Sequence, residues 1–407
     1  MGAGPGVLLF GNHPLPYGGV PRHIESLAGF LADRGWTVHV LSMAGARRGP
    51  EKTHGYTIHR PSRAERFELL ARMAARHPRF IARQSLRFSG FATRSPRIFL
   101  GCLSLAAACW DIARRDNLRL ISAYHLFAAG LAGAWAAELL GVPLVTTVFG
   151  EIYAQTEFYR RHLSEVRYVV DRSKMLLSCS HHCSRSLELL GLTEQVRTVH
   201  YGVDTAEFSP GLDATRIRER HGLGAGDNVV LFVGRMVREM GLHVLLTALP
   251  RVLQGDSSIK VLILGASGDL RGEAETCAAR YPGRVFVVAD VMQAELPLYY
   301  AAATIAVSPS VNERACLGLA VAEAMASARP VVVSNIGGGP ELVEHDSNGV
   351  LIPPSDPGAL ADAVLSLAGD GQRCRRLAES GLAMARRGFD QTSTSRRMEE
   401  IFREAHG

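Results

Sequence analysis

The sequence has no unbroken run of about 20 apolar residues, which is the length that a membrane-spanning helix needs. The nearest candidate, Ile98–Trp110, is too short and too rich in alanine, serine and cysteine. The first residues carry no basic segment, and their one apolar run, Val7–Phe10, fits a first β-strand better than a signal peptide. These absences predict a cytoplasmic protein and leave open a peripheral contact with the inner face of a membrane.

Cysteine is present without the spacing of a disulfide framework. The seven cysteines are an odd number scattered along the chain, which indicates reduced thiols. The one cluster is CSHHC at Cys179–Cys183, in which adjacent His181 and His182 cannot easily both face one metal ion. Structural zinc sites usually draw their ligands from two separated pairs. The sequence therefore predicts no metal site.

Positive charge is concentrated in one segment. The net charge is +6, yet Arg60–Arg97 alone holds ten arginines against Glu65 and Glu68. Apolar residues interleaved with these arginines predict one or two basic amphipathic helices. Such helices either form an ordinary solvated face or bind an anionic membrane or a phosphate-bearing acceptor. Nucleic acid is the least favoured partner, because no recognised binding module accompanies the charge.

Length and composition indicate an α/β protein of two domains. The chain has 407 residues, 47% of them hydrophobic and 21% charged, which exceeds what one core usually organises. Strand-like runs alternate with helical patterns in both halves, which predicts parallel sheets with helices on both faces. The expected strands are Val7–Phe10, Thr37–Leu41, Leu120–Ser122, Leu144–Val148, Met175–Leu177, Val229–Val233, Lys260–Leu264, Val285–Val288, Thr304–Val307, Pro330–Val333 and Gly349–Ile352. The turn-rich seam Gly202–Gly226 is no long linker, so we expect two facing domains with a ligand cleft between them.

The loop after the first strand ends in Gly18 and Gly19, directly before a helix. Its glycines permit a close backbone approach, and the helix N-terminus offers amide groups to an anion. The loop is not GxGxxG, so a nicotinamide site has little support. A plain tight turn is the alternative interpretation.

Two later loops carry charged candidates. The stretch VGRMVREMGL follows the strand Val229–Val233, and its Arg235 can hold a phosphate group. The loop before the helical run Gly318–Ala328 contains Glu313, and Glu323 lies about one turn into that helix. A carboxylate there is stabilised by the helix dipole and could accept hydrogen bonds from hydroxyl groups.

A set of short motifs occurs in the order seen in one enzyme family. The motifs are GG at Gly18–Gly19, GVD at Gly202–Asp204, F.P at Phe208–Pro210, FVGR at Phe232–Arg235, SPS at Ser308–Ser310, G....EAMA at Gly318–Ala326, PVVVS at Pro330–Ser334 and NG.LIPP at Asn348–Pro354. In this order the sequence resembles the retaining nucleotide-sugar glycosyltransferases of glycosyltransferase family 4. The resemblance spans nearly the whole chain and is weakest over residues 45–115.

The resemblance implies a GT-B fold and assigns roles to single residues. GT-B proteins have two Rossmann-like domains facing across a cleft, and a C-terminal helix that crosses back to the first domain. The implied domains are residues 1–205, which bind the acceptor, residues 206–385, which bind the nucleotide sugar, and the returning helix 386–407.

The implied donor contacts come mostly from the second domain. Arg235 would pair with the diphosphate, Glu323 would hold the ribose hydroxyls, and His125 would lie beside the reacting face of the sugar. The remaining donor contacts would come from Gly18, Gly19, Val291, Leu317, Gly318 and Leu319, with the base also near Gly265–Gly268.

Two departures from the family pattern concern the phosphate site. Met240 stands where the family usually has a lysine, and Arg238 is the candidate substitute. Ala315 stands where the family usually has a glutamate, and Glu313, two residues earlier, could swing in. A missing diphosphate contact costs about 2–4 kcal/mol in a desolvated site.

The resemblance implies a retaining, metal-independent transferase that uses a UDP- or GDP-sugar as co-substrate and no other cofactor. No DxD-like carboxylate pair stands where a metal would serve. The acceptor would offer a hydroxyl or amine, in bacterial cell-envelope glycan or secondary-metabolite biosynthesis. It could be phosphorylated, lipid-linked or a small natural product. The losses at Met240 and Ala315 support an alternative, a catalytically weakened nucleotide-sugar-binding protein that serves a partner enzyme, and a sugar epimerase is less favoured.

Overall fold

The structure, a computed structural model, describes residues 4–13, 18–43, 45, 49–289 and 291–406. Its contacts divide the chain into an N-terminal unit, Met1–Val199 with Ser395–Gly407, and a C-terminal unit, His200–Thr394. The resemblance had placed these divisions after residues 205 and 385. Residues directly after Val199 belong to the C-terminal unit because Val203 bonds to its last segment: the Val203 amide donates to the Phe389 carbonyl at 2.8 Å, and the Gln391 amide donates to the Val203 carbonyl at 2.9 Å.

An eight-stranded sheet forms the centre of the N-terminal unit, in the order β3-β4-β2-β1-β5-β6-β7-β8. Neighbouring strands are parallel, except for the antiparallel pair of β3 and β4. The strands are β1 (Gly6–Phe10), β2 (Thr37–Leu41), β3 (Glu51–Thr53), β4 (Tyr56–His59), β5 (Leu120–Tyr124), β6 (Leu144–Val148), β7 (Met175–Ser178) and β8 (Val196–Thr198). Because β1 pairs with both β2 and β5, the strand order reverses direction beside β1.

The C-terminal unit contains a parallel six-stranded sheet in the order β11-β10-β9-β12-β13-β14. Its strands are β9 (Asn228–Val233), β10 (Ile259–Gly265), β11 (Val285–Ala289), β12 (Ile305–Ser308), β13 (Val331–Ser334) and β14 (Val350–Ile352). In sequence order this is 3-2-1-4-5-6, the order of a Rossmann-type sheet, and it reverses direction between β9 and β12. Each unit is therefore a doubly wound α/β domain, as the sequence predicts.

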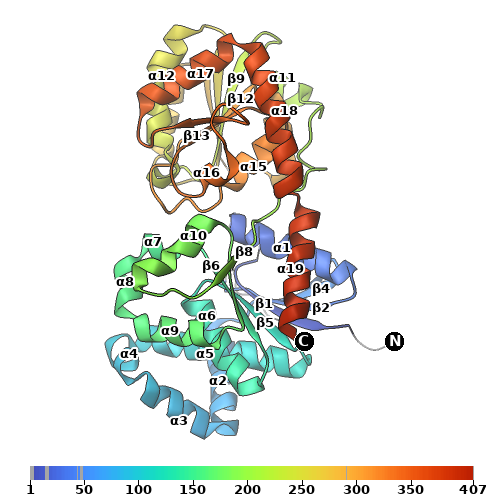
Figure 1. Cartoon of the computed structure of the whole chain (residues 1–407), viewed down its shortest axis with the longest axis vertical. Coiled ribbons are helices and arrows are strands. Elements are labelled where there is room, and N and C mark those ends of the chain that lie inside the picture. The colour runs from blue at the N-terminus through green and yellow to red at the C-terminus, as the bar shows by residue number, and fades with distance from the viewer. Residues whose placement is uncertain (1–3, 14–17, 44, 46–48, 290, 407) are drawn as a thin grey trace. The chain divides into compact units, whose positions relative to one another are not determined.

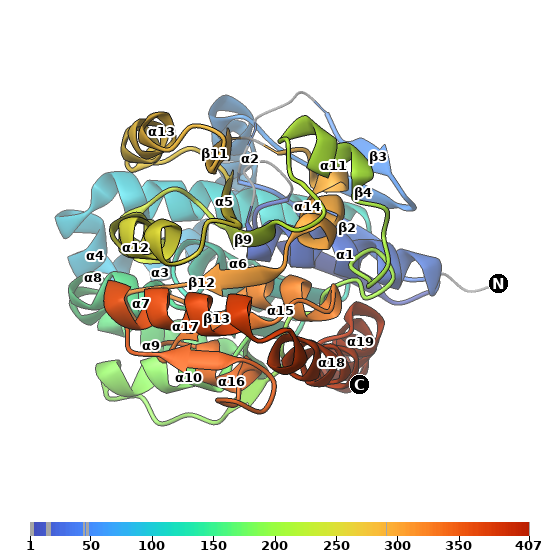
Figure 2. The same ribbon diagram turned by 90° about the horizontal axis from the view of Figure 1, so that it is seen from above.

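Helices cover both sheets (Figures 1 and 2). Those of the N-terminal unit are α1 (Gly19–Asp33), α2 (Arg63–Arg76), α3 (Pro78–Arg87), α4 (Ser89–Arg94), α5 (Pro96–Arg115), α6 (Ala128–Leu140), α7 (Glu151–Ala154), α8 (Thr156–Arg161), α9 (Leu163–Arg172), α10 (His181–Arg185) and the 3-10 helix η1 (Ser186–Leu190). Those of the C-terminal unit are α11 (Thr215–Arg220), η2 (Arg238–Met240), α12 (Leu242–Gly255), α13 (Arg271–Arg280), η3 (Gln293–Glu295), α14 (Leu296–Ala302), α15 (Leu319–Ala326), α16 (Gly339–Leu342), α17 (Pro357–Gly369) and α18 (Gly371–Gly388). The last helix, α19 (Gln391–His406), begins in the C-terminal unit and ends in the N-terminal unit.

The expected strands are all present, with ends within two residues of the expected ones. Three strands were missed: β3, β4 and β8. β3 and β4 form a short polar hairpin at the sheet edge, where His54 and Gly55 turn the chain with φ values of 39° and 81°. Three or four residues are too few for a clear alternation of apolar and polar positions, so the sequence pattern could not show them.

The basic segment Arg60–Arg97 forms three helices, α2, α3 and α4, followed by the start of α5, rather than one or two. Figure 1 shows α2, α3 and α4 in succession along one edge of the N-terminal unit. Most of their arginines are exposed, but Arg60 is not on a helix at all. It follows β4, is only 8% exposed, and pairs through Nη1 with Glu51 Oε2 at 2.9 Å. Arg60 is thus a buried ion-pair partner and not part of a solvated face.

The apolar segment near residue 100 is longer than the sequence pattern indicated. α5 has 20 residues and a mean hydropathy of 1.3, which is sufficient in length and composition to cross a membrane. Of the apolar stretch, 67% is buried, and residues such as Cys109 and Trp110 pack in the hydrophobic core with α6. α5 therefore has the burial of a core helix.

Candidate functional site

Loops after neighbouring strands of the C-terminal unit pack directly on one another where the strand order reverses. Gly241, in the loop after β9, has a φ of 74°, and a Cβ added there would lie 1.7 Å from the carbonyl oxygen of Pro309, after β12. A Cβ on Gly338, after β13, would lie 1.6 Å from the Cys316 carbonyl oxygen. Only glycine fits at either position. Three loops thus form one close-packed edge at the carboxyl ends of the strands, where open α/β sheets bind ligands.

Two guanidinium groups of the loop after β9 are exposed at this edge. Neither the Arg235 guanidinium nor the Arg238 guanidinium makes a hydrogen bond or ion pair with any residue that the structure describes. Glu239, by contrast, has a partner: its Oε1 pairs with Arg314 Nη1 at 3.1 Å and joins η2 to the loop after β12. The two unpaired cations are available to an anionic ligand, while the loop that carries them is held in place.

Met240 is partly buried and packs against the hydrophobic core of the C-terminal unit. It is the last residue of η2 and directly precedes Gly241. The methionine therefore has a packing role at the position where the family resemblance implies a lysine.

The N-terminus of α15 lies at the same edge of the sheet. Gly318 is its N-cap with a φ of 81°, and no side chain caps the helix. Leu317 is buried at 3% exposure and anchors the turn, while Leu319 is the first helical residue. The first-turn amides of an uncapped helix attract anions. The three residues expected to face the sugar and diphosphate are thus brought together at this turn.

Glu323 lies on the buried side of α15, with 6% of the residue exposed. Its Oε2 accepts a hydrogen bond from the Tyr300 hydroxyl at 2.9 Å. The same hydroxyl lies 3.1 Å from the carbonyl oxygen of Ala320, one turn earlier in α15. The carboxylate is therefore held by a side chain of α14, a partner that sequence spacing did not indicate.

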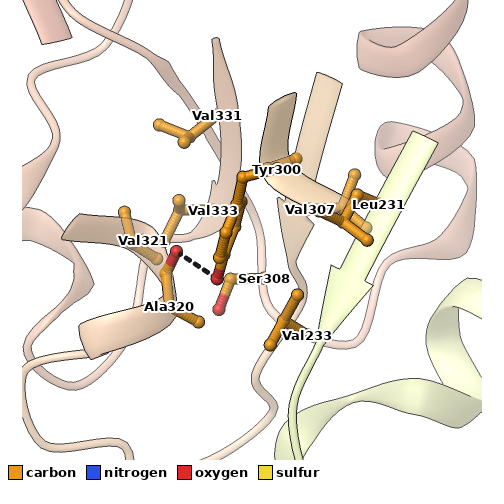
Figure 3. A pocket seen from close by; sticks show the side chains of 10 residues that line it. Leu231, Val233, Tyr300, Val307, Ser308, Ala320, Val321, Val331 and Val333 are labelled. Atoms are coloured by element: carbon orange, nitrogen blue, oxygen red, sulfur yellow. Dashed lines mark hydrogen bonds between the residues drawn. The ribbon is translucent and has the colours of Figure 1, made fainter. Parts of the chain in front are cut away.

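A small cavity lies beneath this turn of α15, between the helix and strands β9, β12 and β13 (Figure 3). Its volume is about 10 Å³, close to the minimum for one water molecule, and its lining is mainly apolar. A nucleotide cannot enter it. The cavity is a packing void behind the α15 turn rather than a substrate pocket.

The other donor-site candidates of this unit lie in loops. Glu313 is exposed in the loop after β12. Ala315 is packed tightly, because its carbonyl accepts the Gly338 amide at 2.9 Å and its Cβ would lie 3.1 Å from a Cβ on Gly337. Val291 follows β11 and is partly buried.

The strand order of the N-terminal unit reverses between β1 and β5, and candidates follow both strands. Gly18 and Gly19 are exposed at the start of α1, after β1, and a Cβ on Gly18 would meet only Pro21 Cδ, at 3.6 Å. Packing with the described residues therefore gives no reason for glycine at position 18. The family resemblance remains the reason to expect a role for Gly18 in the donor site.

His125 directly follows β5 and has an unusual backbone. Its φ of 88° is strained for a residue with a side chain, and 38% of that side chain is exposed, so it is not a core histidine. Its Nδ1 lies 3.7 Å from Glu151 Oε2, and its ring centroid lies 4.8 Å from that of Phe149. Glu151 is itself fixed, since its carboxylate accepts the Leu126 and Phe149 amides at 3.2 and 2.7 Å. Strain held by such surroundings is typical of functional positions.

The CSHHC segment does not gather its four donors. The sulfur atoms of Cys179 and Cys183 lie 3.9 Å apart, but His182 stacks on Tyr153, with ring centroids 4.4 Å apart, and His181 Nδ1 lies 3.2 Å from the Thr198 hydroxyl. The described side chains of this segment therefore do not form a four-ligand site.

One other cluster of the N-terminal unit has donor atoms close enough to hold a metal: His39, His59 and Asp116. Its histidines already satisfy each other, because His39 Nδ1 and His59 Nε2 lie 2.9 Å apart and share a hydrogen bond. Asp116 lies 3.3 Å from His39 Nδ1 and is paired with Arg115 at 2.8 Å. The three side chains therefore form a polar network with one another and with Arg115.

Comparisons with known proteins show the family of the chain. Residues 17–207 match the family described as Glycosyltransferase Family 4, and residues 227–370 match Glycosyl transferases group 1. A D-inositol 3-phosphate glycosyltransferase of Xylanimonas cellulosilytica is 32% identical over 294 residues, which are 67% of this chain and 69% of that protein. The chain belongs to the GT-B glycosyltransferases.

Solved structures share the fold of this glycosyltransferase over its whole length. Sucrose-phosphate synthase from Thermosynechococcus elongatus has a TM-score of 0.75 at 22% identity and covers 98% of both chains. The Anabaena protein HepE in complex with UDP has a TM-score of 0.74 at 20% identity and covers 98% of this chain and 99% of its own. These neighbours confirm the GT-B fold that the resemblance implied.

Sequence reasoning singled out charged candidate residues of this glycosyltransferase but not the residues that contact them. Tyr300, Glu151 and the Glu239–Arg314 pair were not singled out. Tyr300 contacts a residue on a different helix, and no periodic pattern reveals such a pair. Glu151 offered a weak signal, since it begins α7 directly after the short loop that follows strand β6.

Proposed function

We propose that this glycosyltransferase moves a sugar from a nucleoside-diphosphate-sugar to an acceptor hydroxyl or amine, with retention at the anomeric carbon. The observation that carries the proposal is the pair of unpaired cations, Arg235 and Arg238, on a loop that packs against the loop leading to the uncapped α15. A diphosphate carries the charge that such a site is built to neutralise. HepE, whose fold is similar, is known in complex with UDP.

The proposed donor site uses the groups gathered at the carboxyl edge of the C-terminal sheet. Arg235 and Arg238 neutralise the diphosphate together with the amides near Gly318, and Glu323 accepts the ribose hydroxyls. Val291 lies near the base, and the amides of Leu317 and Leu319 face the sugar and phosphates. A UDP- or GDP-sugar is the co-substrate.

Transfer with retention is proposed to occur on one face of the sugar. The bond from the anomeric carbon to the departing phosphate oxygen breaks, and the acceptor oxygen or nitrogen bonds to the same face. The acceptor proton passes to the departing phosphate oxygen, so no protein nucleophile is required. Arg235 stabilises the developing charge on the phosphate, His125 supports the sugar, and Glu313 serves in place of the glutamate that Ala315 replaces.

The donor proposal is tested by a thermal-shift screen against UDP-, GDP-, ADP- and dTDP-sugars, because a bound nucleotide raises the melting temperature by mass action. One nucleotide class should stabilise the protein, and Arg235→Ala should abolish the shift and lower kcat/KM by about 100-fold or more. Product anomers read by NMR test retention. If the donor binds tightly and is neither hydrolysed nor transferred, the protein is instead a nucleotide-sugar-binding partner of another enzyme.

The acceptor is proposed to carry a phosphate group. The relative from Xylanimonas cellulosilytica is named for an inositol phosphate, and the N-terminal unit displays exposed arginines on α2, α3 and α4. Exposed apolar side chains accompany them: Leu86, Ile98 and Leu100 are 77%, 42% and 44% exposed. This combination suits a phosphorylated or lipid-linked acceptor at an anionic membrane surface.

The membrane part of this proposal is tested by flotation with vesicles that contain an anionic phospholipid. At low salt the protein should float with the vesicles, and Arg72→Glu with Arg79→Glu should release it. No flotation at low salt contradicts the membrane contact, and a soluble phosphorylated acceptor then remains, to be tested by transfer to inositol phosphate.

A further inference from the structure

Tyr300 is a buried tyrosine whose hydroxyl lies among apolar side chains (Figure 3). It belongs to α14 and is 1% exposed. Its surroundings include Leu231 and Val233 of β9 and Val331 and Val333 of β13. A buried hydroxyl needs a hydrogen-bond partner. Here the hydroxyl points toward α15 and finds its partners there, Glu323 Oε2 at 2.9 Å and the Ala320 carbonyl at 3.1 Å.

The space beside this hydroxyl is small. The cavity beside Tyr300 has a volume of about 10 Å³, at the limit for one water molecule, and Ser308 is one of its few polar neighbours. A phenylalanine at position 300 would therefore leave the Glu323 carboxylate without this donor. Hydrogen bonds to charged groups contribute about 1.5–3 kcal/mol, which corresponds to roughly 10- to 100-fold in an equilibrium.

We infer that Tyr300 is a positioning residue that fixes the Glu323 carboxylate for the donor ribose and so determines preference for ribonucleotides over 2′-deoxyribonucleotides. The inference rests on the proposed role of Glu323. A carboxylate with one oxygen tied to α14 keeps one rotamer, and only a preorganised acceptor gains the full hydrogen bond of a ribose hydroxyl. A site built to bond a hydroxyl rejects the analogue that lacks it, because the carboxylate then loses the hydrogen bond from that hydroxyl.

Tyr299 provides a matched control on the same helix. It is equally buried, at 0% exposure, but its hydroxyl faces Arg220 Nη1 at 3.2 Å and His221 Nε2 at 3.3 Å, away from Glu323. Tyr299→Phe removes the same atom from the neighbouring position. Any effect of burial or of lost tyrosine polarity in general appears in both variants.

The experiment measures dissociation constants of the full chain for UDP, GDP and ADP and for their 2′-deoxy counterparts by calorimetry. The wild type should bind its preferred ribonucleotide about tenfold or more tightly than the 2′-deoxy form. Tyr300→Phe should weaken ribonucleotide binding and reduce that preference several-fold, with little change for the deoxynucleotide. Tyr299→Phe should keep the wild-type preference, and Glu323→Gln should abolish it.

The outcomes separate this inference from the proposed function. A wild-type preference that is lost in Glu323→Gln but kept in Tyr300→Phe overturns the role of Tyr300 and leaves the donor site intact. A wild type that binds none of the nucleotides, or a Glu323→Gln variant with unchanged preference, overturns the proposed site itself. Equal melting temperatures of the two phenylalanine variants show that both fold. If Tyr300→Phe does not fold, Ser308→Ala tests the same cavity wall and should leave the preference unchanged, while Glu323→Asp, which shortens the carboxylate away from Tyr300, should reduce it.

Discussion

In both units the strand order of the sheet reverses, but the residues at the reversal differ. In the C-terminal unit, glycines such as Gly241 are forced by close contact between loops, and the exposed cations Arg235 and Arg238 stand on that rigid edge. In the N-terminal unit, a Cβ on Gly18 would meet only Pro21 Cδ among the described residues, and the distinctive feature is a strained His125 held beside Glu151. The described C-terminal edge is thus rigid and carries exposed positive charge, which is the basis of the donor site proposed for it. The described N-terminal edge is distinguished instead by backbone strain at its histidine.

Buried histidines are expected to make the N-terminal unit less stable at acidic pH. Burial lowers the pKa of His13 and His59 to about 4 and that of His23 to about 3. In the C-terminal unit burial also lowers the pKa of His221 and His243, but both are only partly buried. Because the folded pKa lies below the unfolded value of about 6.5, this stability is present above pH 6.5 and is lost as pH falls toward 4.

The largest expected effect is therefore that acid unfolds the N-terminal unit before the C-terminal unit. Each deeply buried histidine should lower the free energy of unfolding by about 2 kcal/mol at pH 5 relative to neutral pH. All three tryptophans, Trp36, Trp110 and Trp135, lie in this unit, so their fluorescence follows it alone, while circular dichroism follows both units. When the pH is lowered from 7 to 5, the thermal unfolding transition followed by fluorescence should shift to lower temperature by more than the transition followed by circular dichroism. Coincident shifts would show that the units do not differ, and His59→Gln should reduce the separation.

The next prediction compares a glycine of each unit. Gly241→Ala places a Cβ 1.7 Å from the Pro309 carbonyl oxygen at a φ of 74°, and should destabilise the C-terminal unit by about 3 kcal/mol or more. Gly18→Ala meets only Pro21 Cδ, at 3.6 Å, among the described residues and should change stability by less than about 0.5 kcal/mol, yet weaken transfer. Urea unfolding and initial rates measure the two effects. A stable Gly241→Ala protein, or a fully active Gly18→Ala protein, would contradict the comparison.

A smaller effect is expected at His125. His125→Gly relieves the strain of its φ of 88° and should gain about 1 kcal/mol of stability, while kcat falls about tenfold because the sugar loses its support. His125→Asn, which tolerates a positive φ, is the control for the backbone and should show the loss of activity without a large gain in stability. Unchanged kcat in both variants would remove His125 from the proposed site.

Much of this architecture could be predicted from residue patterns, because a strand buried in a parallel sheet has a recognisable run of apolar and β-branched residues. Thr37–Leu41 and Leu144–Val148 are rich in valine, leucine and threonine, and the structure gives strands with those same ends. The hairpin of β3 and β4 has no such run, since it is short and lies at an edge. Arg60 was misread as a surface charge because a single arginine carries no sign that Glu51 will pair with it in a buried position.

The segments that carry the candidate site could be located from the sequence, but the contacts that hold them could not. Arg235 follows strand β9 and Glu323 lies in the first turns of α15, and both belong to ordered motifs, so their positions could be identified along the chain. The Tyr300 hydroxyl and the φ of His125 depend on how distant elements pack, and only coordinates reveal them.

The smallest effect is expected where the C-terminal edge departs from its family, at Met240. The side chain packs on the core of its unit, so Met240→Lys should lower the melting temperature slightly, while the lysine stem keeps part of that packing and its ammonium reaches outward. If the ammonium reaches the diphosphate, donor affinity should rise by up to about tenfold, the range of one charge-assisted hydrogen bond. Met240→Leu keeps the packing without the charge and should match the wild type in a thermal-shift titration with the preferred nucleotide. A lysine variant with unchanged affinity would mean that position 240 serves the core alone and that the exposed arginines carry the phosphate charge without it.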